Sequence, residues 1–289
     1  MKKENRARWL LMGAMFIFGT LGPFVRNIGV SSGELALYRA VMAAVMVGAF
    51  LLVTRQKIPF AAIKKELPLL LISGVAMGFN WILLFQAYKY TTVSVATLSY
   101  YFAPVIVTVV CPLLFKEKMT LKQILCFVMS TVGLVMITGV GIKGGTDLIG
   151  IAFGLGAAVL YASVILLNKF IKGVVGIHRT FLQFLAAIAV LIPYVAFTGG
   201  VTLGSLNTTG WICLLIVGVV HTGVTYCMYF SSLKELPGQK AAILSYIDPL
   251  VAVLVSVMVL RETLTIPQLI GGLLILGFTL WNELPDKKK

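Results

Sequence analysis

Charged residues are scarce in this sequence. Asp, Glu, Lys and Arg make up 12% of the 289 residues, and 59% of the residues are hydrophobic. Soluble domains carry about 25% charged residues. A chain with a mean hydropathy of +0.99 has too little polar surface to cover a water-soluble globule. The composition therefore excludes an ordinary soluble protein and predicts an all-α membrane protein that crosses the bilayer many times.

Acidic, histidine and cysteine residues are few as well. With 10 Asp and Glu, 2 His and 4 Cys, and with no CxxC pair, we expect no metal site, no cofactor and no enzyme activity. A GxxxxGK[ST] motif is lacking, which argues against ATP drive within this chain. The net charge of +14 is spread between apolar runs rather than gathered in one stripe, so nucleic acid is not an expected partner.

Long hydrophobic runs are abundant. A membrane-spanning helix needs about 20 mostly apolar residues, and ten runs approach that length. The predicted spans are Trp9–Ile28, Leu35–Val53, Leu67–Tyr88, Val93–Phe115, Leu121–Thr138, Leu148–Phe170, Thr180–Phe197, Trp211–Leu233, Ala241–Leu260 and Pro267–Leu284.

Basic residues fall unequally on the two sides of these spans. If the N-terminus is cytoplasmic, 19 of the 24 Lys and Arg residues lie on its side. The exceptions are Arg26, Arg39, Lys89, Lys143 and Arg261. Because cytoplasmic loops of membrane proteins are rich in Lys and Arg, we expect a multi-pass protein of the cytoplasmic (inner) membrane with both termini in the cytoplasm.

The two halves of the chain repeat each other. Residues 96–123 match residues 241–268 at a constant shift of 145 positions, about half the chain. The matched pairs include Tyr101 with Tyr246, Pro104 with Pro249 and Gln123 with Gln268. Five spans per half is an odd number, so the second half must begin on the opposite side of the membrane. The sequence predicts ten transmembrane helices arranged as a 5+5 inverted repeat, with halves 1–140 and 141–289.

These features resemble the drug/metabolite transporter superfamily, in its ten-helix form with two EamA-type halves. The motifs that carry the resemblance are Tyr101-x-x-Pro104 before Lys116-Glu117, Tyr246-Ile-Asp-Pro249 before Arg261-Glu262, Phe18-Gly19-Thr20 and Tyr38-Arg39. The resemblance implies a secondary transporter that moves a small metabolite, such as an amino acid, by alternating access, with export as the expected direction. A lipid carrier or lipid flippase on the same scaffold and, less favoured, an integral membrane enzyme remain as alternatives.

Asp248 and Arg39 are the charged residues placed deepest in the predicted spans. An acid at such depth costs about 2.5–3.5 kcal/mol on insertion scales, so it should face water or a partner. Asp248 is a candidate for binding a substrate amine or for proton coupling; a structural ion pair with Arg39 or a hydrogen bond between helices is the alternative. Arg39 suits a carboxylate or phosphate, but it could also extend to the headgroups. His221 is a second proton-coupling candidate, unless it is a hydrogen-bonded core residue.

Aromatic and amide side chains gather in corresponding helices of the two halves. Trp81 and Tyr226 match at the shift of 145. We expect a cavity near the bilayer midplane that would bind substrate through Tyr38, Arg39, Asn80, Trp81, Phe85, Tyr101, Tyr161, Tyr226, Tyr246 and Asp248. Ordinary helix packing is the alternative for the aromatic members. A pocket with one acid and one base would suit a zwitterion.

Pro104 and Pro249 are predicted to be helix hinges. Inside a helix, each removes one backbone hydrogen bond and bends the axis. Matched interruptions of this kind point to the central site of inverted-repeat transporters, although a bend that only adjusts packing is the alternative.

Two further patterns have structural interpretations. Glu117 and Glu262 also match at the shift of 145; each precedes a capping box, and we expect each acid to pair with the basic residue before it or to contact the nearby turn. The ridge Gly150-x-x-x-Gly154-x-x-x-Ala158 lets another helix approach closely. It could serve internal packing or a homodimer, and the sequence leaves both open.

Overall fold

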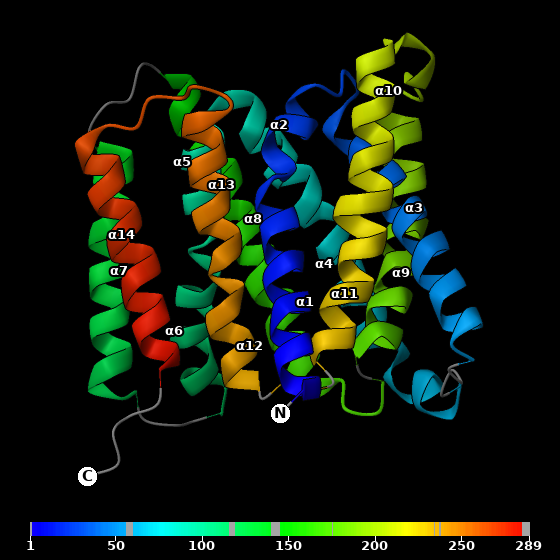
Figure 1. The fold of residues 1–289 in the computed structure, drawn as a ribbon, viewed down its shortest axis with the longest axis horizontal. Coiled ribbons are helices and arrows are strands. Elements are labelled where there is room, and N and C mark those ends of the chain that lie inside the picture. Colours follow the sequence, from blue (N-terminus) through cyan, green and yellow to red (C-terminus); the bar gives the residue numbers. More distant parts are fainter. Residues whose placement is uncertain are drawn as a thin grey trace.

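A computed structural model describes residues 2–55, 60–115, 119–139, 145–174, 176–233, 235–236 and 238–284 of the chain (Figure 1). All regular elements of these residues are helices, which confirms the all-α prediction. The first half of the chain contains α1 (Lys2–Gly19), α2 (Leu21–Arg26), α3 (Ser32–Val53), α4 (Phe60–Tyr90), α5 (Val93–Tyr100), α6 (Ala103–Phe115) and α7 (Leu121–Gly139).

The second half is helical in the same way. It contains α8 (Gly145–Phe170), α9 (Gly176–Thr198), the short 3₁₀ turn η1 (Leu203–Ser205), α10 (Thr208–Leu215), the π-helix η2 (Ile216–Val224), α11 (Thr225–Leu233), α12 (Gly238–Ser245), α13 (Ile247–Met258) and α14 (Ile266–Glu283). The boundary predicted between the halves, at residues 140 and 141, lies outside the described residues.

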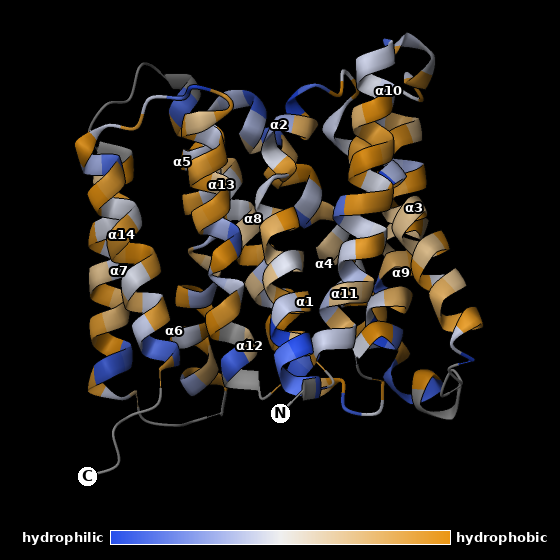
Figure 2. Cartoon of the chain, viewed as in Figure 1, coloured by the Kyte–Doolittle hydropathy of each residue, from blue (hydrophilic) through white to orange (hydrophobic). Residues whose placement is uncertain are grey.

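Most of the helices are long and apolar. Seven helical stretches of the described chain could cross a membrane by length and composition, and two shorter apolar helices cover Leu121–Ile137 and Ile243–Met258. Hydrophobic side chains such as Val45, Leu254 and Leu273 remain exposed on their outer faces, as expected for surfaces in contact with lipid. Figure 2 shows orange residues along the helices and blue residues toward the two ends of the bundle.

The start of α1 and the end of α14 lie at the same end of the bundle, the lower end in Figure 1. We refer to it as the terminal end and to the other as the distal end. The connection from α8 to α9 lies at the terminal end, and the connection from α9 to α10 lies at the distal end. The chain therefore passes from one end of the bundle to the other repeatedly.

Small residues bring the helices together. A Cβ atom on Gly271 of α14 would collide with the backbone oxygen of Gly133 in α7, so these helices cross with their backbones in contact. On α8, Gly150 packs against Thr91, and Gly154 packs against Ser99 of α5. The small-residue ridge of α8 therefore serves packing within the chain.

Two of the predicted spans are interrupted at matched positions. The helix from Val93 breaks between α5 and α6, and the helix from Gly238 breaks at Tyr246, between α12 and α13. Pro104 and Pro249 follow these breaks, in the first turn of α6 and of α13. This corrects the expected position of the prolines within their helices, because in a first turn the missing N–H removes no helical hydrogen bond. Their role as hinges stays a prediction.

The two capping boxes form as predicted, on Thr120 with Gln123 and on Thr265 with Gln268. Glu117 lies outside the described residues. Glu262 contacts the side chain of Arg26 in α2, with a nitrogen–oxygen distance of 2.6 Å. This corrects the expected pairing of Glu262 with the preceding arginine, and it joins segments far apart in the sequence.

Candidate functional site

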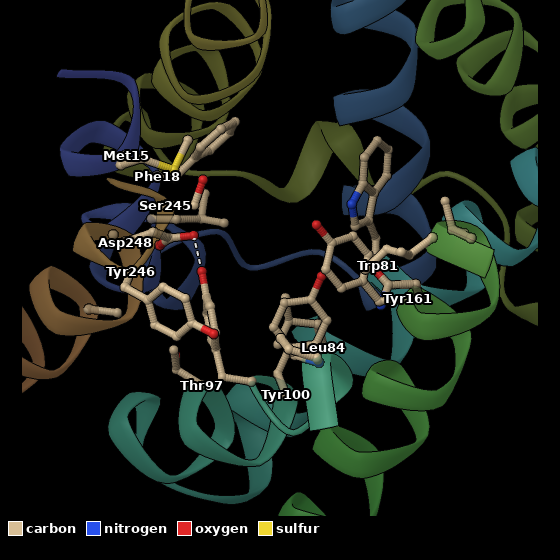
Figure 3. Close-up of a pocket in the computed structure, with 18 of the residues that line it drawn as sticks. Met15, Phe18, Trp81, Leu84, Thr97, Tyr100, Tyr161, Ser245, Tyr246 and Asp248 are labelled. Carbon is tan, nitrogen blue, oxygen red and sulfur yellow. Dashed lines mark hydrogen bonds between the residues drawn. The ribbon is translucent and has the colours of Figure 1, made fainter. Parts of the chain in front are cut away.

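A cavity of about 390 Å³ lies inside the bundle, where the two helix breaks meet (Figure 3). Its lining extends from Thr97 in α5 to Glu283 at the terminal end of α14. The predicted site residues that line it are Arg39, Asn80, Trp81, Tyr101, Pro104, Tyr161, Tyr226, Tyr246 and Asp248. Side chains from both halves of the sequence therefore converge on one space.

Asp248 forms one wall of the cavity from the first turn of α13. The hydroxyl of Tyr101, at the break after α5, donates a hydrogen bond of 2.5 Å to Asp248 Oδ2 (Figure 3). The two residues are 147 positions apart. A charge-assisted bond of this kind is among the stronger hydrogen bonds in proteins, so it fixes the carboxylate and joins the two breaks.

Arg39 is held in an aromatic setting within α3. Its guanidinium carbon lies 4.7 Å from the ring centroid of Trp81 and 5.7 Å from that of Phe85. Its Nε donates a hydrogen bond of 2.9 Å to Thr222 Oγ1. Within the described chain Arg39 and Asp248 form no ion pair, which was one alternative for these residues. Arg39 is only 4% exposed, so it does not extend to the headgroups either.

The partner of Arg39 belongs to an unusual element. Thr222 lies in the π-helix η2, and its hydroxyl donates 2.8 Å to the carbonyl of Val217, five residues earlier. π-Helical turns are rare and occur frequently at functional sites. Here the wider turn places a hydroxyl oxygen where it can orient the guanidinium.

The charged groups face each other across an aromatic space. In Figure 3, Asp248 and Trp81 lie on opposite sides of the cavity, and Arg39 stacks on Trp81. Between them, the rings of Tyr100 and Tyr161 lie 5.3 Å apart. A ligand with a cationic and an anionic end, and an apolar or aromatic body, matches this arrangement of charge.

The distal end of the cavity is covered by close helix packing. A Cβ atom on Gly19 would lie 2.6 Å from the carbonyl oxygen of Asp248, and one on Gly22 would lie 2.5 Å from a methyl group of Val93. Only glycine allows α1 and α2 to approach α13 and α5 this closely. Since Glu283 lines the cavity at the other end, the cavity lies toward the terminal end of the bundle.

Four predicted residues lie elsewhere. Tyr38 donates a 3.0 Å hydrogen bond to Glu34, and Phe85 is fully buried beside Arg39. His221 has its Nε2 3.0 Å from Thr20 Oγ1. Pro249 is buried in the first turn of α13. Consecutive helical residues point about 100° apart, and Tyr38 points to Glu34 whereas Arg39 lines the cavity.

Tyr88, Thr97 and Tyr100 are among the lining residues that the sequence interpretation missed. Tyr100 precedes Tyr101 directly. Helix α5 ends at Tyr100, and Tyr100 and Tyr101 both line the cavity at this break. If the sequence interpretation had predicted a helix break just before Pro104, it would have identified Tyr100 as a cavity residue. No pattern in the sequence indicates Tyr88 or Thr97.

These observations define a class: a multi-pass helical membrane protein with a mixed-charge cavity inside the bundle. The model of the EamA-like transporter family matches residues 5–139 and, a second time, residues 148–282. The chain therefore belongs to the EamA-like transporter family, which confirms the resemblance carried by its motifs.

The chain is similar to other members over nearly its whole length. It is 29% identical to the uncharacterized transporter YxxF of Bacillus subtilis, covering 94% of this chain and 89% of that protein. It is 31% identical to an uncharacterized transporter of Archaeoglobus fulgidus, over 92% and 93% of the two chains. A solved protein crystal structure has the same fold, with a TM-score of 0.66 at 17% identity over 94% and 95% of the chains.

Proposed function

We propose that this protein is a secondary transporter that moves a small zwitterionic metabolite, such as an amino acid, across the cytoplasmic membrane by alternating access. The observation that carries the proposal is the cavity with Asp248 on one wall and Arg39, stacked on Trp81, on the other. A substrate ammonium would bind Asp248, and a substrate carboxylate would bind the guanidinium of Arg39. The tyrosines between them would contact the substrate body.

The proposed architecture is ten transmembrane helices in a 5+5 inverted repeat, with halves 1–140 and 141–289. Two observations support it. The family model matches twice, once in each half. The interrupted helices that correspond in the repeat run in opposite directions, with α5–α6 going from the distal to the terminal end and α12–α13 returning (Figure 1). Opposite directions for matched segments are the geometric signature of inversion.

Export is the proposed direction, with both termini in the cytoplasm. The basic residues of the sequence support this orientation. The cavity would then reach toward the cytoplasmic side, because it extends toward the terminal end. Asp248 is the proposed coupling residue for protons, and His221, which contacts Thr20 at the junction of α1 and α2, is the second candidate.

Counterflow in proteoliposomes tests this function. Vesicles are preloaded with a mixture of amino acids and other metabolites, and uptake of labelled compounds is followed without any imposed gradient. Asp248→Asn keeps the size of the side chain and an acceptor for Tyr101, but it removes the negative charge. We expect the wild type to exchange a zwitterionic substrate. The exchange rate of Asp248→Asn should be about tenfold lower, which corresponds to about 1.4 kcal/mol.

Two controls make the outcome specific. Glu4→Gln removes a carboxylate of α1 that pairs with Arg8 and Lys240 away from the cavity, and it should exchange normally. Tyr101→Phe removes the donor to Asp248 and should reduce exchange, whereas Tyr246→Phe, at the matched repeat position, should have less effect. Equal exchange by the wild type and Asp248→Asn would remove Asp248 from the binding site. Exchange of no soluble metabolite would favour the lipid carrier instead.

A further inference from the structure

Glu262, just after α13, is surrounded by donors from three elements. Its carboxylate is 2.6 Å from an Arg26 nitrogen at the end of α2, and its Oε2 accepts a 2.9 Å hydrogen bond from the backbone N–H of Val93, the first residue of α5. The hydroxyl of Ser256 in α13 donates to Oε2 as well. The Glu262 side chain is only 7% exposed, whereas that of Arg26 is 33% exposed, so these four residues, which we call the distal cluster, hold a nearly buried carboxylate beside a partly exposed cation.

The backbone around the distal cluster holds its members in place. Arg261 has a φ of 54°, in the left-handed region, which turns the chain back so that the N–H of Glu262 bonds to the carbonyl of Ser256 at 3.1 Å. Arg26 also donates a 2.7 Å hydrogen bond to the carbonyl of Thr91, just before α5. The cluster therefore fastens α2, α5 and α13 to one another.

The position of the distal cluster relates it to the cavity. The same elements cover the distal end of the cavity, α2 and α5 through the contact of Gly22 with Val93 and α13 through its contact with Gly19 of α1. The cluster joins residues of the two sequence halves, since Arg26 and Val93 belong to the first and Ser256 and Glu262 to the second. A motion that opens the distal end must separate these elements, and it must then break the contacts of Glu262.

A comparable arrangement of residues occurs at the terminal end. Ser256 corresponds to Cys111 at the shift of 145, and Arg26 corresponds to Lys169 at a shift of 143, which applies near the first helix. The structure brings these counterparts together, with Lys169 Nζ 2.8 Å from Cys111 Sγ. At the distal end Arg26 and Ser256 both contact Glu262, and at the terminal end their counterparts contact each other.

We propose that Arg26, Glu262, Ser256 and the amino end of α5 form a lock that keeps the cavity closed at the distal end and that breaks when this end opens. The proposal rests on the transport function given above. Removing Arg26 would leave the nearly buried Glu262 carboxylate without its cation. Opening the distal end instead admits water to Glu262, so the lock stabilises the closed state selectively.

Cysteine accessibility measures this lock directly. In a protein whose four native cysteines are replaced by alanine, Thr97→Cys places a thiol on the wall of the cavity. Position 97 is four residues, about one helical turn, after Val93, which contacts Glu262. A membrane-impermeant maleimide is added to each face in turn. We expect Glu262→Gln and Arg26→Gln to raise labelling from the distal face about tenfold, equivalent to about 1.4 kcal/mol.

Two controls separate opening from unfolding. Lys89→Gln removes a cation at the same end that donates 3.0 Å to the carbonyl of Val30 within the first half, and it should leave labelling unchanged. A parallel protein keeps Cys126, which is fully buried in α7, as its only thiol. Labelling of Cys126 in Glu262→Gln would show general unfolding and would overturn the lock, as would unchanged labelling at position 97.

The lock and the transport function can fail separately. Wild-type counterflow with unchanged accessibility in both lock variants would keep the transporter and overturn the lock. Increased distal labelling in a protein that exchanges no soluble metabolite would support the lock and overturn the proposed function.

Discussion

The guanidinium of Arg39 combines a planar stack with a directional hydrogen bond. It faces the Trp81 ring at 4.7 Å, and its Nε donates to Thr222. Within the described residues this is the guanidinium's one hydrogen bond, which leaves its terminal N–H groups to a ligand in the cavity. A lysine keeps the charge, but it can neither stack in this way nor present two parallel donors.

Substituting Arg39 with lysine should therefore weaken binding of a carboxylate substrate. We expect exchange by Arg39→Lys to fall about tenfold at low substrate concentration, or about 1.4 kcal/mol, measured by counterflow over a range of concentrations. Thr222→Val removes only the acceptor of Nε and should cost less, with the loss appearing as weaker apparent affinity. Wild-type exchange by Arg39→Lys would show that the planar geometry is not used.

At the scale of helices, the crossing of α7 and α14 depends on glycine. A side chain at Gly271 would strike the backbone of Gly133, whereas one at Gly277, in the same helix, would meet nothing within 4 Å. The two glycines thus form a matched pair in which only one position carries the contact between helices. Overpacking of a close contact typically costs about 1–3 kcal/mol.

Leucine at these two positions should give opposite results. We expect Gly271→Leu to separate α14 from α7 and to lower the midpoint of thermal unfolding in detergent, and Gly277→Leu to leave it unchanged or slightly higher because leucine favours helix more than glycine does. Size-exclusion chromatography after heating measures the folded fraction. Equal midpoints for both variants would mean that α7 and α14 tolerate separation.

The helices of this protein were predictable, but their rotation was predictable only in part. Apolar runs indicate where each helix lies, and Trp81 and Tyr226, which match at the shift of 145, both line the cavity. Tyr38 was predicted to complete an aromatic ring around the cavity, but its hydroxyl donates to Glu34 instead. The π-helix η2 could not be anticipated, because its five-residue hydrogen bonds have no counterpart in the hydrophobic pattern.

At the scale of the whole molecule, the site and the lock both consist of contacts between the halves. Tyr101 contacts Asp248, 147 positions later in the sequence. Arg26 contacts Glu262 across most of the length of the chain. The repeat indicated which residues occupy equivalent positions in the two halves, but equivalent residues need not contact each other. Glu262 shows the difference: its sequence neighbour Arg261 is basic, yet its partner comes from α2, because packing of the halves decides which charge lies closest.

The orientation of the whole molecule decides which side the cavity faces. Gly204 lies in the turn η1 before α10, at the distal end, and a side chain there would meet no neighbour within 4 Å. Lys172 lies after α8, at the terminal end, and is exposed. Since 19 of the 24 basic residues are predicted on the side of the termini, this side should face the cytoplasm.

Single cysteines at these positions test the orientation in intact cells. With the native cysteines replaced, an impermeant maleimide should label Gly204→Cys at once and Lys172→Cys only after the membrane is permeabilised. The reverse pattern would place the termini outside, and the cavity would then reach toward the exterior, as in an importer awaiting substrate. Labelling of both positions in intact cells would indicate mixed insertion, which the strong bias of basic residues argues against. The same two proteins calibrate the faces for the lock measurement, because they establish from which side the distal cluster is approached.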